Sequence, residues 1–484
     1  MLKAGGIASG LQHVKKSLFN TLSKFFLFFD RLLALLKTGN FFPQGMAAAA
    51  KILYNTNRST NIKGPWHGAR HQPSRRRPVD FENQGRGRLP MFAQEMYQLG
   101  ASRSCIRELF EYGLRQAAVV GKENVYDFSL GNPSIPAPEE VRQAFSQLIT
   151  REDSLSVHGY TPAPGSMEAR AAVAADLNER FQADIRPENL FLTCGAAPAL
   201  ISVIRALAVE GAEIMAIAPF FPEYRPFVES NGVKFVVAPA DTQTFQIPVA
   251  EVEQRLTPHT QAIIVNSPNN PSGAIYSQEN LLALGEVLTR KGAEYGHPIY
   301  IIADEPYREL VYDGAEVPFI PNLYPNTIVC YSWSKSLSLP GERIGYVCVP
   351  DQAADSADLY AAVAGAARAL GHVCAPSMQQ LVAGLCAAVR PDLAAYDENR
   401  KTLYDALTGY GYRCVRPQGA FYLFVQAPGG DAQAFSDRAK EKNLLIVPGG
   451  DFGCPDYFRA STCVSHDMIL RSLPVFEQLI RESR

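Results

Sequence analysis

The chain has 484 residues, of which 47% are hydrophobic and 19% are charged. This composition is typical of a globular protein with a large core and roughly two to four domains. The net charge of −2 hides an asymmetry, because residues 1–90 carry 15 Lys and Arg against 3 Asp and Glu, whereas residues 91–484 carry 31 against 45. The acidic body of the chain argues against nucleic acid as its partner.

The nine cysteines are scattered along the chain, their number is odd, and no CxxC pair occurs. Several lie in apolar runs, where a free cysteine behaves as a small hydrophobic residue. We therefore expect a reducing, cytoplasmic compartment and no metal site.

The first ninety residues differ from the rest. An amphipathic to apolar stretch over 14–42 is interrupted by Lys24, Asp30 and Arg31, so no run of 18 apolar residues is present to span a membrane. Residues 70–90 are rich in Arg, Pro and Gly, a composition typical of disorder. Three interpretations stay open: a basic membrane-surface helix with a linker, an organelle-type transit segment, or a non-native extension ahead of Met91. The last is favoured, because globular patterning begins abruptly at Met91, and no function is assigned to this segment.

From residue 91 onward, apolar runs rich in β-branched residues alternate with helix-like stretches such as 197–211 and 277–292. Such runs predict a mostly parallel sheet covered by helices on both faces, an α/β fold. A smaller α+β unit is expected after residue 370, with a long helical stretch over about 376–409. Its strands are predicted near 419–425, 443–449 and 457–463. The strands of the main sheet are predicted at 189–195, 213–219, 233–240, 261–268, 298–305, 327–334 and 343–350.

Ligands of open α/β sheets bind beyond the carboxyl ends of the strands. Five predicted strand ends deliver GAAPAL, FFPEY, NNPSG, EPY and a lysine. Each of these has an ordinary structural explanation when taken alone, but their shared position weakens that explanation. GAAPAL also opens a helix, so the N–H groups of Ala196 and Ala197 and the helix dipole form a candidate anion site.

Lys335 follows the strand-like run TIVCYSW, with Ser332, Ser334 and Arg343 close in sequence. An amine that attacks a carbonyl must be neutral, and burial beside cations lowers its pKa. An arginine with hydroxyl and backbone N–H groups suits a phosphate. Together these features indicate a phosphorylated aldehyde, pyridoxal 5′-phosphate (PLP).

Four further residues fit the ring of this cofactor. A buried carboxylate at Asp304 would keep the ring nitrogen protonated, as an electron sink requires. Asn270 could donate a hydrogen bond to the ring phenolate, and Tyr307 could reach the same oxygen. Phe221 could stack on the ring, although an isolated phenylalanine is more often part of a core.

In this order, NSPNNPSG, ADEPYREL and SWSKSLSLPGERIGY resemble the class I/II PLP-dependent aminotransferases of fold type I, relatives of aspartate aminotransferase. The resemblance covers about residues 91–484. It implies a large PLP-binding domain over 140–370 and a small domain made of 91–139 and 371–484. It also implies a homodimer with composite active sites.

The resemblance implies a role for each residue near the ring. Lys335 would bind the cofactor covalently and act as the proton-shuttling base. Asp304 would bind the ring nitrogen, and Asn270 and Tyr307 the ring hydroxyl, with Asn270 also near the substrate. Phe221 matches the ring-stacking aromatic.

Other matches concern the substrate and the phosphate. Arg459, in YFRASTC, matches the arginine that grips the substrate α-carboxylate, and Gly131, in SLGNPSIP, matches a loop near the substrate. Tyr160, in HGYTPAPG, matches the tyrosine that reaches the phosphate in the neighbouring subunit. The phosphate of the chain's own cofactor would be held by Ser332, Ser334, Arg343 and the N–H groups of Ala196 and Ala197.

The sequence departs from the family in two respects, and both concern the distal carboxylate of a substrate. Some bacterial aspartate aminotransferases carry a lysine in the glycine-rich loop, and here that position is Ala197. No arginine matches the one that other relatives lend across the dimer to a dicarboxylate. Aspartate therefore has no identified residue to read its distal carboxylate, and the amino donor, the oxo acid and the pathway stay open.

The predicted reaction is transamination, in which an L-amino acid leaves as a 2-oxo acid and a second 2-oxo acid takes up the amino group. A β- or γ-eliminating PLP-dependent lyase would use the same residues and is the alternative. A PLP-sensing transcription regulator is a remote alternative, because it needs a helix-turn-helix that residues 1–90 do not show.

Overall fold

The computed structural model describes residues 91–483 except 102–103, 152 and 387–388. The three interpretations of residues 1–90 lie outside the described residues. Among the described residues, no helix is long and apolar enough to cross a bilayer.

The largest element is a seven-stranded sheet in the order β2-β8-β7-β6-β5-β3-β4. All seven predicted strands are present. Five of them, from β7 to β4, run parallel, whereas β8 is antiparallel to both of its neighbours, β2 and β7. The strands are β2 Leu190–Thr193, β3 Glu213–Ile217, β4 Lys234–Ala238, β5 Thr260–Asn266, β6 Tyr300–Asp304, β7 Thr327–Ser332 and β8 Gly345–Cys348.

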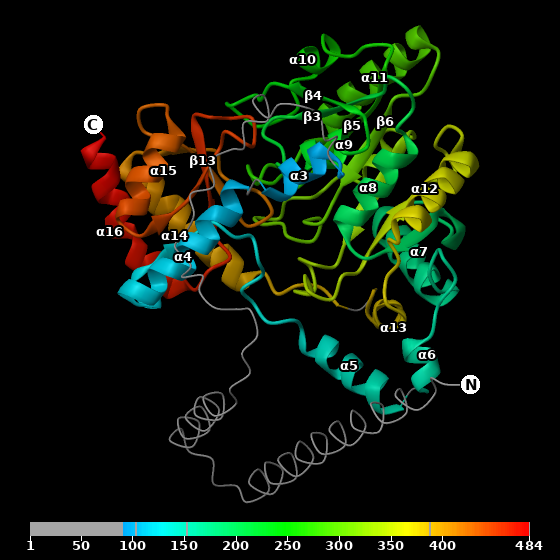
Figure 1. The fold of residues 1–484 in the computed structure, drawn as a ribbon, viewed down its shortest axis with the longest axis horizontal. Helices are drawn as coiled ribbons and strands as arrows, with labels where there is room; N and C mark the ends of the chain where they lie inside the picture. The colour runs from blue at the N-terminus through cyan, green and yellow to red at the C-terminus, as the bar shows by residue number, and fades with distance from the viewer. Residues whose placement is uncertain (1–90, 102–103, 152, 387–388, 484) are drawn as a thin grey trace, which may run out of the picture. The chain divides into compact units, whose positions relative to one another are not determined.

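Helices lie on both sides of this sheet and around the C-terminal part of the chain (Figure 1). The predicted helices at 197–211 and 277–292 correspond to α8 and α11. The first seven are α3 Gln94–Ala101, α4 Cys105–Val120, α5 Glu139–Arg151, α6 Ser154–His158, α7 Met167–Phe181, α8 Ala196–Ala206 and α9 Tyr224–Glu229. The others are α10 Val249–Glu253, α11 Gln278–Tyr295, α12 Ser356–Leu370, α13 Pro376–Leu385, α14 Ala394–Tyr410, α15 Ala432–Glu441 and α16 His466–Glu482.

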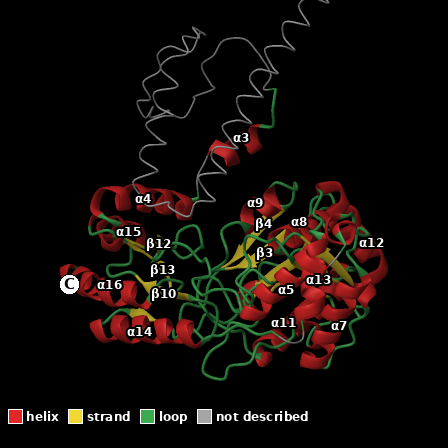
Figure 2. Cartoon of the chain, turned by 90° about the horizontal axis from the view of Figure 1, so that it is seen from below, coloured by secondary structure: helices red, strands yellow, loops and turns green. Residues whose placement is uncertain are grey.

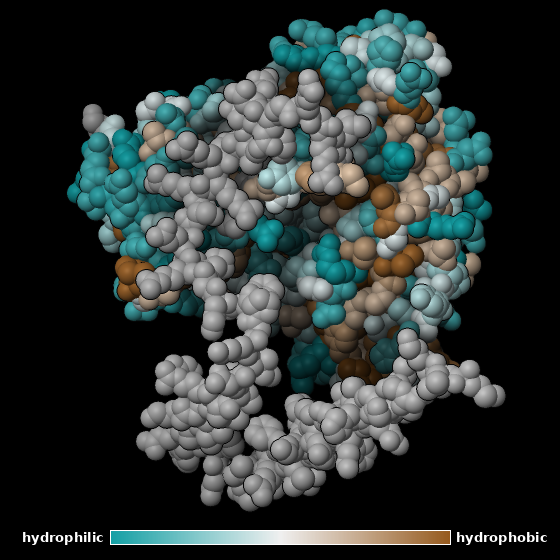
Figure 3. Space-filling view, viewed as in Figure 1, coloured by the Kyte–Doolittle hydropathy of each residue, from teal (hydrophilic) through white to brown (hydrophobic). Residues whose placement is uncertain are grey.

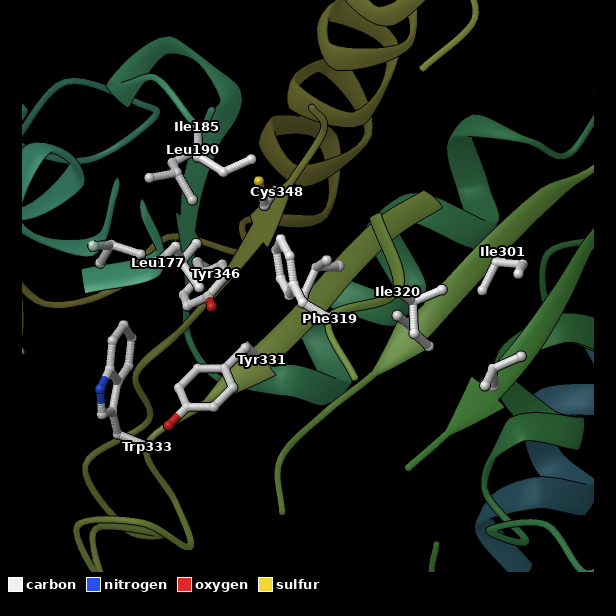
Figure 4. Close-up of a cluster of buried hydrophobic side chains, with 14 of the residues drawn as sticks. Leu177, Ile185, Leu190, Ile301, Phe319, Ile320, Tyr331, Trp333, Tyr346 and Cys348 are labelled. Carbon is white, nitrogen blue, oxygen red and sulfur yellow. The ribbon is translucent and has the colours of Figure 1, made fainter. Parts of the chain in front are cut away.

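Alternate residues of each strand enter two separate apolar cores, as the two faces of a pleated sheet require. In β6, Ile301 packs in a core with helices α7, α11 and α13, whereas Ile302 packs in a core with α8, α9 and α12. Figure 4 shows the first of these cores, where the rings of Tyr331 and Tyr346 stack with centroids 5.1 Å apart. Burial on both faces explains why these strands read as continuous apolar runs.

The long helical stretch predicted over about 376–409 is two helices, α13 and α14. Pro391 lies in the non-helical segment between them. Proline removes a backbone donor, and its ring disfavours helical geometry in the residue before it, so a continuous helix through 391 is costly. The prediction of one helix was therefore wrong at this point.

A second, antiparallel sheet has the order β12-β13-β10-β9 and lies among helices α14, α15 and α16 (Figure 2). The predicted strands near 419–425, 443–449 and 457–463 all contribute to the C-terminal sheets. A short parallel pair, β1 with β11, joins the N-terminal part of the chain to this region. The strands are β1 Tyr126–Asp127, β9 Arg413–Cys414, β10 Tyr422–Gln426, β11 Leu444–Leu445, β12 Val447–Pro448 and β13 Tyr457–Ser461.

The β1–β11 pair is the reason to propose that 91–139 and the C-terminal residues form one small domain beside the large one. Helix α13, however, packs against α5, α6 and α7 through Met378 and Leu381, within a core of the large sheet. We therefore propose that the large domain extends past residue 370, to about the end of α13.

Hydrophilic side chains cover most of the visible surface of α15 and α16 (Figure 3).

Candidate active site

The register of the large sheet brings the predicted strand ends to one edge. Asn266, the last residue of β5, pairs with Asp304, the last residue of β6. On the other side, Gly345 of β8 pairs with both Ser332 of β7 and Thr193 of β2. Because β8 runs antiparallel, its first residue meets the last residues of its two neighbours. The polar groups that follow these strands are therefore held together by backbone pairing.

A cavity of about 340 Å³ opens at this edge. Every predicted site residue except Tyr160 lines it. Tyr160 lies in the loop after α6 and is fully exposed. The predicted residues that line the cavity are Gly131, Ala196, Ala197, Phe221, Asn270, Asp304, Tyr307, Ser332, Ser334, Lys335, Arg343 and Arg459.

Lys335 follows β7 and presents its amine to the cavity. Its Nζ donates a hydrogen bond of 2.7 Å to the carbonyl oxygen of Gly131, and it lies 5.6 Å from the ring centroid of Phe421. Burial lowers the pKa of Lys335 to about 8, and the positive charges of Arg459 and Arg343 act in the same direction. About one tenth of the amine is therefore neutral at pH 7, far more than for an ordinary lysine, and this neutral form is the one that attacks a carbonyl.

Asp304 is buried, with one carboxylate oxygen paired and the other not. Tyr224 donates a hydrogen bond to Oδ2, while Oδ1 has no hydrogen-bond partner. Burial raises the pKa of Asp304 to about 7, although the hydrogen bond from Tyr224 acts against this. An unpaired buried carboxylate oxygen costs free energy, so a cationic N–H donor that binds at Oδ1 would stabilise the carboxylate.

Asn270 and Arg459 are in direct contact. Arg459 Nη1 donates to Oδ1 of Asn270 at 3.0 Å, and Nη2 donates to the carbonyl oxygen of Ser129 at 2.6 Å. The third nitrogen, Nε, is buried without a partner. The backbone N–H of Asn270 donates to Oδ1 of Asn266 at 2.7 Å, which fixes the loop that carries it. A buried guanidinium with an unused donor is suited to a carboxylate ligand.

The residues predicted to hold a phosphate lie at the start of α8 and in the loop after β7. Gly195, just before α8, has φ +111°, and a Cβ built there would lie 2.6 Å from Nη2 of Arg343. Only glycine allows the guanidinium to approach the start of the helix this closely. Arg343 itself has φ +55°. The free N–H groups at the start of α8 and this guanidinium together favour an anion.

The structure also adds residues that the sequence did not predict. Asn266 could have been found, because it is the first residue of NSPNNPSG, the motif that also contains Asn270. Tyr224 is the last residue of FFPEY and Tyr422 lies in the strand predicted near 419–425, but their contacts with Asp304 and Tyr307 arise from tertiary packing and could not be read from the sequence. The unpredicted residues that line the cavity are Ile106, Leu200, Phe227, Asn266, Pro306, Pro340 and Tyr422.

Comparison with known proteins agrees with the predicted fold and activity. The family model for aminotransferase class I and II matches residues 123–473. A crystal structure of an aminotransferase from Eubacterium rectale is 53% identical, covers 82% of this chain and 100% of its own, and superposes with a TM-score of 0.80.

Two curated relatives carry different substrate names. An aspartate aminotransferase of Geobacillus stearothermophilus is 30% identical over 364 residues, which is 72% of this chain and 88% of the relative. An aromatic-amino-acid aminotransferase of Thermococcus litoralis is 25% identical over 396 residues, which is 78% of this chain and 96% of the relative. The predicted α/β fold and the predicted aminotransferase activity are confirmed: the chain belongs to the class I and II aminotransferases.

Proposed function

We propose that this aminotransferase uses PLP to move the amino group of an L-amino acid to a 2-oxo acid in two half-reactions. The proposal rests on two groups that line the same cavity. One is a buried amine with a lowered pKa, and the other is a buried carboxylate oxygen without a partner. These are Lys335 Nζ and Asp304 Oδ1. An aldehyde on a pyridinium ring is a ligand that satisfies both groups.

The other polar groups fit the rest of this cofactor. The start of α8 with Arg343, Ser332 and Ser334 suits its phosphate. Tyr307 and the amide nitrogen of Asn270 are available to the ring oxygen, and Phe221 to the face of the ring.

PLP, when bound, withdraws electrons from the substrate and so makes the Cα proton of an amino acid acidic. Lys335 would supply the amine that binds the cofactor and, once released, would move this proton from Cα to the cofactor carbon that had carried the aldehyde. Arg459 orients the substrate by binding its α-carboxylate through the fork of the guanidinium. Asp304 keeps a proton on the ring nitrogen, which maintains the electron demand.

The substrates are proposed as an L-amino acid and a 2-oxo acid, with 2-oxoglutarate as the first acceptor to test. Among the described residues, the cationic side chains that line the cavity are Lys335, Arg343 and Arg459. Each of them already has a role in the proposal, in binding the cofactor or the α-carboxylate. Aspartate and aromatic amino acids, named in the two relatives, both belong in the first set of donors.

We also propose a cytoplasmic homodimer in which Tyr160 acts on the site of the other subunit. Tyr160 is fully exposed and absent from the cavity of its own chain, while its hydroxyl is free to donate to a phosphate. An exposed aromatic of this size is suited to a contact with a second copy.

The decisive experiment is the absorbance spectrum of the purified protein before and after addition of single amino acids. A yellow band that bleaches with an amino acid and returns with 2-oxoglutarate supports transamination and ranks the donors. Release of ammonia or pyruvate without an acceptor would instead indicate a lyase. A protein that stays colourless after incubation with PLP contradicts the proposal.

A further inference from the structure

Tyr422 is a cavity residue that the sequence did not predict. It is the first residue of β10, its side chain is 3% exposed, and it lines the cavity. Its ring and hydroxyl contact three different parts of the proposed site: Arg459, Tyr307 and the backbone at Gly131.

The ring of Tyr422 lies beneath the guanidinium of Arg459. The distance from the Arg459 Cζ to the ring centroid is 4.6 Å, and the ring of Phe452 lies 5.1 Å from the same carbon. Two aromatic rings therefore hold the plane of the guanidinium, through cation–π attraction and packing. A guanidinium that binds a carboxylate with two parallel hydrogen bonds needs its plane fixed in this way.

The hydroxyl of Tyr422 lies 3.0 Å from the hydroxyl of Tyr307. Burial raises the pKa of Tyr422 to about 12 and that of Tyr307 well above its usual value, so both groups keep their protons at neutral pH. Each hydroxyl has one proton to donate. If Tyr422 donates to Tyr307, the proton of Tyr307 is left free for an acceptor in the cavity.

The same hydroxyl packs against the loop that holds the lysine. A Cβ built on Gly131 would lie 1.7 Å from the Tyr422 hydroxyl oxygen, so no larger residue fits at 131 without displacing the tyrosine. The carbonyl oxygen of Gly131 accepts the hydrogen bond from Lys335 Nζ. Tyr422 thus fixes the backbone that receives this amine.

We propose that Tyr422 is a positioning residue, whose ring orients Arg459 for the substrate carboxylate and whose hydroxyl directs the Tyr307 proton toward the ring oxygen of the cofactor. This inference rests on the proposed function. The role of the ring and the role of the hydroxyl can be tested separately, because each can be removed by a different substitution.

Tyr422→Phe removes the hydroxyl and keeps the ring. The matched control is Tyr312→Phe, because Tyr312 is also 3% exposed, donates one hydrogen bond to Ala420 O at 2.6 Å and lies under Arg400, but does not line the cavity. In the holoenzyme, Tyr422→Phe should raise the pKa of the pH-dependent absorbance change of the bound cofactor by about one unit, since a hydrogen bond that stabilises the ring oxyanion is weakened. Tyr312→Phe should leave it unchanged.

A double variant tests whether the hydroxyl acts through Tyr307. If it does, Tyr307→Phe with Tyr422→Phe should shift the absorbance pKa no further than Tyr307→Phe alone. Equal and additive shifts would overturn the relay. Should Tyr422→Phe fail to fold, Gly131→Ala forces the same hydroxyl away and should give the same shift.

Tyr422→Leu removes the ring as well. Binding of 3-phenylpropionate, an unreactive carboxylate, to the holoenzyme should weaken about tenfold more in Tyr422→Leu than in Tyr422→Phe, because the cation–π contact is lost only in the former. Tyr312→Leu is the control for lost packing. Equal affinities in the two Tyr422 variants would overturn the role of the ring.

The two proposals fail in different ways. A chain without any cofactor band contradicts the proposed function. A chain that binds PLP and transaminates, but whose Tyr422 variants match their Tyr312 controls in every measurement, contradicts only the role of Tyr422.

Discussion

Tyr224 donates its hydroxyl proton to Oδ2 of Asp304, and the second oxygen of this buried carboxylate, Oδ1, is left without a partner. The tyrosine lies at the start of α9 and the aspartate at the end of β6. The carboxylate is therefore half satisfied by the protein. Because Oδ1 is buried and has no hydrogen-bond partner, ionisation of Asp304 lowers the stability of the cofactor-free chain.

Asp304→Asn should change how the stability of the cofactor-free chain depends on pH. The pKa of Asp304 is about 7 in the folded chain against 3.8 for an ordinary aspartate, so between these values the folded state keeps a proton that the unfolded state has lost. Stability therefore falls as pH rises from about 4 to 7, by at most about 4 kcal/mol from this group. The variant lacks this loss and should be the more stable chain at pH 8 but not at pH 4, as thermal unfolding would measure.

Asp351→Asn is the control for this comparison. Asp351 pairs with Arg186 at the surface, and this hydrogen-bonded partner lowers the pKa of the carboxylate. Its replacement should give no gain at pH 8. Parallel stability curves for wild type and Asp304→Asn would contradict the raised pKa.

Lys335 should react with aldehydes at an unusually low pH. With a pKa of about 8 instead of 10.5, the neutral fraction at pH 7 is larger by about 300-fold. The rate at which the cofactor-free chain gains the yellow band on addition of PLP should therefore rise with pH to a plateau above about pH 8. A rate that still increases tenfold per pH unit at pH 9.5 would show an ordinary lysine.

Arg459→Ala should weaken carboxylate substrates by about 2–5 kcal/mol, because a buried charge pair loses one partner. The loss should be seen mainly in KM, with the cofactor band retained. Arg205→Ala, on an exposed position of α8, is the control. An unchanged KM in the Arg459 variant would mean that another residue holds the carboxylate.

Hybrid dimers test the role of Tyr160. Lys335→Ala should abolish turnover without loss of the fold. Tyr160→Phe should weaken cofactor binding about tenfold, because a charge-assisted hydrogen bond is lost. In a hybrid of the two variants, one site has both Lys335 and the Tyr160 of the other subunit.

At limiting PLP, purified hybrids should therefore have about half of wild-type activity, one intact site out of two. If each chain used its own Tyr160, the hybrid would have no intact site. Activity no higher than that of the Tyr160→Phe homodimer would then be measured.

The sequence predicted the features that depend on short-range patterns. The strands ending at Asn266 and Asp304 are apolar on both faces, a local property that a parallel sheet explains directly. The grouping of Lys335 with Arg343 also follows from sequence proximity. The reversed direction of β8 could not be predicted in this way, since composition does not encode strand direction.

The remaining errors and omissions have physical causes as well. Periodicity alone hid the break at Pro391, which one imino acid imposes on an otherwise helical pattern. Tyr224 and Tyr422 were missed because each is a single aromatic residue within a longer run, and only tertiary packing brings the hydroxyl of Tyr224 to Asp304 and that of Tyr422 to Tyr307.

The pairing of β2 with β8 has a consequence for how the protein is made. β2 leads directly into the start of α8, yet in the large sheet it pairs only with β8, about 150 residues later in the chain. A nascent chain that has left the ribosome only as far as Lys335 still lacks β8, the strand that pairs with both β2 and β7 and so holds the start of α8 beside the loop after β7. We therefore expect the proposed cofactor to bind a newly synthesised chain only after β8 has emerged, late in translation.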